Sequence, residues 1–122
     1  MTSMVLNVTI DSADPQAQAR FWSGVTGQPA SDESRPGNPF WLVGPPSDQE
    51  GPRLVFVPAT KAKHEKNRVH VDIVPTNCSQ AVELKRLLTL GASVVDDRRQ
   101  APGGGWVVLA DPEGNEFCLE GD

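Results

Sequence analysis

Apolar residues alternate with polar ones in several short stretches of the chain, a spacing typical of β-strands with one buried face. In the first half, this pattern predicts strands at residues 5–10, 28–33, 39–44 and 53–58. In the second half, it predicts strands at residues 68–74, 92–97, 105–110 and 116–120. The last two strands are joined by Asp111-Pro112-Glu113-Gly114-Asn115, whose composition predicts a tight hairpin turn.

Two other stretches have the spacing and the end signals of helices. Asp14 before Pro15 is an N-cap followed by proline at the first helical position, so a helix is predicted from Pro15 to about Val25. Gly27 ends it. A second helix is predicted to run to about Leu90, capped by either Asn77 or Ser79 and ended by Gly91, with a buried side formed by Val82, Leu84, Leu87 and Leu88.

The two halves share one order of elements, namely strand, helix, strand, strand, strand. Their side chains match at a spacing near 63, which sets Asn7 over His70 and Val55 over Cys118. Trp41 matches Trp106 at a spacing of 65, a drift that we attribute to loops. Since one unit of this length cannot bury its own sheet face, the repeat predicts a paired α+β fold. It consists of two tandem βαβββ modules that form a curved eight-strand mixed sheet, with a central groove and the helices outside.

The modules are expected at about residues 1–60 and 68–122, joined by a connector at about 59–67. The connector carries a basic run that is either a solvated loop or a rim that attracts an anionic ligand, formed by Lys61, Lys63, His64, Lys66 and Arg68.

Composition narrows the class of protein. The chain has 122 residues, of which 38% are hydrophobic, which suits one globular domain. A net charge of −5 disfavours nucleic-acid binding, and no apolar run approaches the ~20 residues needed to span a membrane. The first residues lack the features of a signal peptide, so Cys78 and Cys118 are expected to be free thiols in a reducing cytoplasm.

Three stretches resemble the vicinal oxygen chelate superfamily, which includes glyoxalase I, extradiol dioxygenases, fosfomycin-modifying enzymes and bleomycin-resistance proteins. They are the strand His70-Val71-Asp72-Ile73 before a helix, the turn at residues 111–115 before the last strand, and the Phe21-Trp22 helix that ends near Gly27. The resemblance covers almost the whole chain and implies one small glyoxalase-like domain over residues 1–122. It also implies a homodimer, because the superfamily commonly pairs modules across chains.

In catalytic members of that superfamily, side chains from the first and last strands of each module hold a divalent metal. The matching positions in this chain are Asn7, Val55, His70 and Cys118. Only His70 fits the family pattern, so no metal site is favoured. The alternative is a divalent metal held by a displaced set of ligands, namely His70, Asp72 and Glu120. These side chains are expected on one face, because side chains two residues apart on a strand point to the same side.

Two functions follow from the resemblance and from the residues. The favoured one is binding of a small, partly aromatic molecule in the groove, as in drug sequestration, with contacts from Asn7, Trp41, Val55, Val57, His70, Asp72, Trp106, Cys118 and Glu120. The alternative is a lyase, isomerase or dioxygenase. That enzyme would use either a divalent metal or, without metal, His70 as a general base oriented by Asp72.

Two simpler interpretations of these side chains also stay open. His70 and Asp72 could be a polar pair that satisfies only itself. Cys118 could be a packing residue, or a thiol made reactive by a pKa that His70 lowers.

Overall fold

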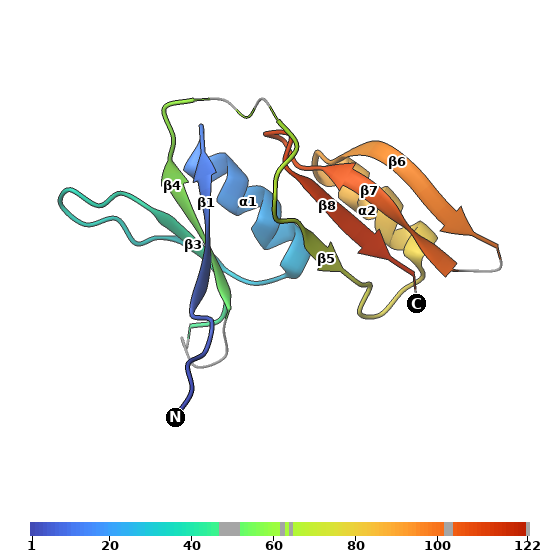
Figure 1. The fold of residues 1–122 in the computed structure, drawn as a ribbon, viewed down its shortest axis with the longest axis horizontal. Coiled ribbons are helices and arrows are strands. Elements are labelled where there is room, and N and C mark those ends of the chain that lie inside the picture. Colours follow the sequence, from blue (N-terminus) through green and yellow to red (C-terminus); the bar gives the residue numbers. More distant parts are fainter. Residues whose placement is uncertain (47–51, 62, 64, 102–103, 122) are drawn as a thin grey trace. The chain divides into compact units, whose positions relative to one another are not determined.

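The computed structural model describes residues 1–46, 52–61, 63, 65–101 and 104–121. Within these residues the chain forms two helices and eight strands (Figure 1). They divide into two compact units, Met1–Ala62 and Lys63–Asp122.

The first unit has the elements β1 (Asn7–Ser12), α1 (Pro15–Thr26), β2 (Ala30–Asp32), β3 (Trp41–Val43) and β4 (Arg53–Pro58). Its sheet has the order β1-β4-β3-β2, in which β1 runs parallel to β4 and the other pairs are antiparallel. α1 packs against β3 and β4. Its buried residues, which include Phe21 and Trp22, form a core together with Val43 and Phe56.

The predicted end signals of α1 are confirmed. The carboxylate of Asp14 accepts a hydrogen bond from the Ala17 N–H at 3.1 Å, which satisfies one of the free donors of the first turn. Gly27 adopts a φ of 72°, a left-handed conformation that glycine takes without strain and that ends the helix.

The second unit has the elements β5 (Val71–Ile73), α2 (Gln80–Leu90), β6 (Ser93–Gln100), β7 (Gly104–Ala110) and β8 (Glu116–Glu120). Its sheet order, β5-β8-β7-β6, repeats that of the first unit. The two predicted βαβββ modules are therefore confirmed, with their eight strands divided between two four-stranded sheets. β5 is shorter than predicted, and Val69 and Val74 beyond its ends are exposed.

The cap of α2 is Ser79 and not Asn77, because the Ser79 hydroxyl accepts a hydrogen bond from the Val82 N–H at 3.2 Å. Leu84 and Leu87 are buried as predicted. Val82 and Leu88 are 57% and 41% exposed, so their predicted burial was wrong.

Two polar residues occupy the inward positions of α2 in their place. Gln80 Nε2 donates to the Leu119 carbonyl at 3.1 Å and to the Gly105 carbonyl at 3.3 Å. Glu83 is also buried, and its Oε1 accepts from Arg86 Nε at 2.6 Å. A polar group can occupy a buried position when it has such partners, which is why hydrophobicity alone misplaced this face.

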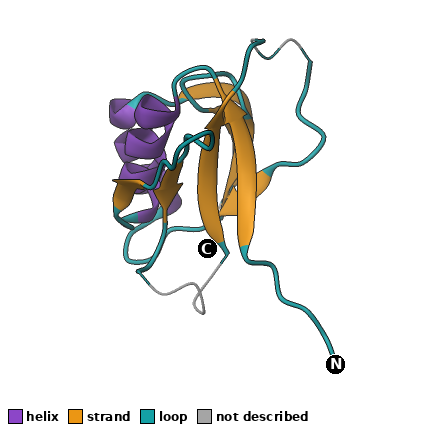
Figure 2. Ribbon diagram, turned by 90° about the vertical axis from the view of Figure 1, so that its left-hand side faces the viewer, coloured by secondary structure: helices purple, strands orange, loops and turns teal. Residues whose placement is uncertain are grey.

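Residues 1–6 precede β1 as an exposed loop (Figure 2). Both cysteines are free thiols, as expected. Within the described residues, none of the helices has the length and apolar character needed to cross a membrane.

Candidate functional site

The sheet of the second unit has one buried face and one open face. α2 covers one face of this sheet (Figure 1). The fully buried apolar side chains on that face are Val107, Leu109, Phe117 and Leu119. The alternate positions of β7 and β8 point the other way, because successive side chains of a strand face opposite sides. The open face holds a pocket of about 310 Å³ lined by Lys66, His70, Asp72, Trp106, Val108, Glu116, Cys118 and Glu120.

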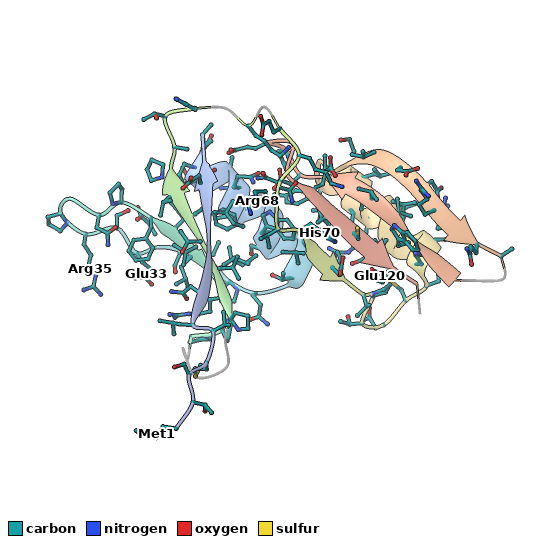
Figure 3. All side chains as sticks on the ribbon, in the orientation of Figure 1. Met1, Glu33, Arg35, Arg68, His70 and Glu120 are labelled. Atoms are coloured by element: carbon teal, nitrogen blue, oxygen red, sulfur yellow. The ribbon has the colours of Figure 1, made fainter. Side chains whose placement is uncertain are left out.

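His70 and Asp72 meet in this pocket. His70 directly precedes β5 and Asp72 lies within it, so the two side chains fall on the same side of the chain. His70 Nε2 lies 3.2 Å from Asp72 Oδ1, and the two side chains are 49% and 54% exposed. Figure 3 labels His70 beside β5 and Glu120 on β8. The predicted shared face is confirmed, and the pair is accessible to a ligand.

Cys118 lies directly opposite Asp72 in the parallel pairing of β5 and β8. Partial burial raises the pKa of the Cys118 thiol, and the nearby charges of Asp72, Glu120 and Glu116 raise this pKa further. The thiol also forms a hydrogen bond with the Asp72 carboxylate, which favours the protonated form. The interpretation of Cys118 as a thiol activated by a lowered pKa is therefore wrong.

Three side chains form a cluster of metal-ligand types. The donor atoms of His70, Asp72 and Cys118 all lie within 4.8 Å of one another. This differs from the displaced set predicted from sequence, because Cys118 takes the place of Glu120. Imidazole, carboxylate and thiolate are zinc ligands, whereas Mg²⁺ and Mn²⁺ prefer oxygen donors. The residues therefore fit Zn²⁺, which would displace the Cys118 proton on binding.

The corresponding first-unit positions carry different side chains. Thr9 pairs with Val55 as Asp72 pairs with Cys118, so the spacing of 63 that matched Val55 to Cys118 is confirmed by strand register. Asn7 at the start of β1 is half-buried, and Val57 shares the face of Val55.

The matching of the two tryptophans at a spacing of 65 was wrong. Trp106 pairs with Glu120, so it lies on the open face and lines the pocket. Trp41 pairs with the fully buried Phe56 and therefore shares the buried face of its sheet. Within the second unit, Trp106 is brought together with His70 and Asp72. The role of Trp41 as a ligand contact stays a prediction.

Sequence reasoning missed three residues of the pocket as ligand contacts. Val108 and Glu116 each lie two residues from a predicted contact on the same strand, so the alternation could have identified both. Lys66 was recognised only as part of the basic run. His64 of that run lies outside the described residues.

Comparison with known proteins shows the family to which this chain belongs. Residues 7–120 match the family model of the glyoxalase-like domain. The chain belongs to this glyoxalase-like family. The resemblance to the vicinal oxygen chelate superfamily, to which the family belongs, is thereby confirmed. No curated protein matches the sequence of this glyoxalase-like chain.

Solved structures share the fold of the glyoxalase-like chain at low sequence identity. One is TnmS3, an antibiotic binding protein from Streptomyces sp. CB03234, with 20% identity over 98% of this chain and 95% of TnmS3, at a TM-score of 0.65. A glyoxalase/bleomycin resistance protein/dioxygenase family enzyme from Burkholderia phytofirmans PsJN has 16% identity over 96% of this chain and 97% of its own chain, with a TM-score of 0.72. The fosfomycin resistance protein FosX from Listeria monocytogenes has 16% identity over 100% of this chain and 93% of its own chain, with a TM-score of 0.70. These likenesses show the fold.

Proposed function

We propose that this protein binds a small, partly aromatic organic molecule on the open face of its second unit, and that binding requires no metal. The observation that carries the proposal is the pocket of about 310 Å³, which is at the lower end of the ~300–1,000 Å³ typical of ligand sites. Its lining joins an accessible indole to several polar groups, a combination that can hold and orient one small molecule.

Each lining residue has a role in this proposal that its chemistry supports. Trp106 is 40% exposed and offers a flat surface for an aromatic ring, and Val108 extends the apolar contact. The His70–Asp72 pair offers a donor and an acceptor to the polar part of the ligand. Cys118, protonated and buried, contributes shape more than reactivity.

Drug sequestration is the form of binding that we favour. TnmS3, with the same fold, is an antibiotic binding protein, which supports small-molecule binding as a role that this fold can perform. The first-unit contacts Asn7, Trp41, Val55 and Val57, and a reducing cytoplasm for the two free thiols, stay predictions.

A thermal-shift screen of small aromatic molecules against three proteins tests this proposal. Compounds that stabilise the wild type should also stabilise Trp106→Phe, which retains an aromatic face. They should lose about fivefold or more in affinity for Trp106→Ala, because a stacking contact contributes ~1 kcal/mol beyond its area. Compounds that bind the wild type, Trp106→Ala and His70→Ala equally well would show that the ligand site lies elsewhere.

A zinc-dependent enzyme is the second candidate, favoured by the donor atoms that lie within 4.8 Å of one another. His70, Asp72 and Cys118 would hold Zn²⁺, which acts when bound as a Lewis acid on a substrate oxygen. Native mass spectrometry of freshly purified protein separates the candidates. One zinc per chain that is lost in His70→Ala would contradict metal-free binding, whereas a metal-free mass with an organic adduct would support it.

A further inference from the structure

The pocket contains more negative than positive groups. Three carboxylates line it, from Asp72, Glu116 and Glu120, and Lys66 is the one lysine or arginine among its described lining residues. Asp72 has partners in His70 and the Cys118 thiol. Within the described residues, the carboxylates of Glu116 and Glu120 form neither an ion pair nor a hydrogen bond.

Glu116 and Glu120 add negative charge to the face of the sheet that carries Cys118. Glu116 and Glu120 are both partly buried, on either side of Cys118 along one strand. Since side chains two residues apart share a face, each of the two carboxylates lies on the side of the sheet that Cys118 faces. Asp72 stands directly opposite Cys118, two residues from Glu120, so a cation bound beside Glu120 is attracted by both carboxylates. Lys66 is exposed, so its charge is screened by solvent.

Trp106 adds a second, independent preference for positive charge. It lies directly across from Glu120 in the antiparallel pairing of β7 and β8. Cross-strand neighbours of this kind have Cβ atoms about 5 Å apart, so the indole and the carboxylate border the same space. The face of an indole ring attracts ammonium groups, and most strongly where water is partly excluded.

From these two observations we infer that the ligand is an organic cation, with a protonated amine or quaternary ammonium group on an aromatic or apolar body. The cationic group lies between Glu120 and the Trp106 ring, and the apolar body lies along Val108. This inference rests on the proposed function, because it names the chemical class of the ligand of the same pocket. It differs from the alternative in which the basic run attracts an anion, because Lys66 is the one residue of that run's described part that lines the pocket.

Three naphthalene probes of similar size and different charge test this inference. They are 2-naphthylmethylamine, a cation, 2-naphthylmethanol, which is neutral, and 2-naphthoate, an anion. Each is titrated into chelator-treated protein while the ¹H–¹⁵N spectrum is recorded, so that the shifted amides report where the probe binds. The amine should bind about tenfold more tightly than the alcohol, and the naphthoate should not bind.

Two variants make the test specific. Glu120→Gln removes one charge from the pocket with little change of shape, and it should reduce the preference for the amine over the alcohol severalfold. Glu33→Gln removes one charge from an exposed residue of the first unit and should leave the preference unchanged. Added salt should weaken binding of the amine alone.

The possible failures are distinguishable. If the alcohol or the naphthoate binds in the pocket as tightly as the amine, the ligand is not selected by positive charge, and the proposed function still stands. An unchanged preference in Glu120→Gln would likewise overturn the inference. If none of the probes shifts the amides of Asp72, Trp106 or Glu120, both the inference and the proposed function are contradicted.

Discussion

Burial and nearby negative charge act together on the Cys118 thiol. Burial and the nearby carboxylates raise the pKa of the Cys118 thiol, so the midpoint of its alkylation rate against pH should lie above the ordinary thiol value of 9.0. The measurement is the rate of iodoacetamide modification against pH in Cys78→Ser, which leaves one thiol. Asp72→Asn in the same background should lower the midpoint, because it removes a nearby negative charge. A midpoint below 9.0 in the parent protein would contradict this account of the site.

The raised pKa of Cys118 also determines how the free energy of unfolding depends on pH. The folded protein holds the thiol proton more tightly than the unfolded chain does. The stabilisation is therefore complete below the unfolded thiol pKa and is lost as pH rises towards the raised folded pKa. Cys118→Ser, which does not ionise in this range, should show a weaker decline of unfolding free energy at alkaline pH.

At the level of residues, the sequence could predict that His70 and Asp72 share a face, because alternation along a strand is a local property. It could not predict that Cys118 replaces Glu120 beside them. That neighbour depends on which residue of β8 stands opposite Asp72, and the register is fixed only when the strands pair.

At the level of elements, the β6–β7 hairpin depends on Gly105, which precedes Trp106. Its φ of 79° is in the left-handed region, and a Cβ at this position would lie 2.2 Å from the Arg98 carbonyl oxygen. Gly105→Ala should therefore cost about 2 kcal/mol or more of unfolding free energy. It should also weaken ligand binding, because the backbone that carries Trp106 must move.

Gly104→Ala is the matched control for this prediction. A Cβ on Gly104 would meet no atom within 4 Å, and its φ is not in the left-handed region. Its effect should stay within ~0.5 kcal/mol. Urea denaturation of both variants measures the difference, and equal stabilities would contradict the role assigned to Gly105.

The repeat shows why the order of helices and strands was easier to predict than the side of the sheet on which each side chain lies. The predicted order of elements was correct. So was the spacing of 63 residues that relates the first and last strands of one unit to those of the other, because both follow from local patterns. Trp41 was assigned to the wrong face because the connection between β3 and β4 is longer than that between β7 and β8. A one-residue error in register moves a side chain to the opposite side of the sheet.

At the level of the whole molecule, each sheet ends in strands that pair on one side only within the described residues, namely β1 and β2 in one sheet and β5 and β6 in the other. Unpaired strand edges favour association, and we propose a homodimer. Sedimentation analysis should give twice the 13.1 kDa of one chain. A mass of one chain that persists at micromolar concentration would contradict this proposal.

The negative charge of the pocket is also a property of the whole folded molecule. Asp72, Glu116 and Glu120 are separated by up to 48 residues in the chain (72 to 120), and each of them alone resembles an ordinary surface acid. Folding brings them to one face beside Trp106. The sequence could therefore predict the family fold from the repeat, whereas the ligand class depends on a tertiary arrangement of side chains.

The most direct test of the account is a crystal structure of the chelator-treated protein with the tightest compound from the thermal-shift screen. The account predicts an organic molecule against Trp106, with its polar groups on His70, Asp72 or Glu120, and no metal ion between ligand and protein. A molecule bound elsewhere would contradict the central claim, as would binding only after zinc is restored to His70, Asp72 and Cys118.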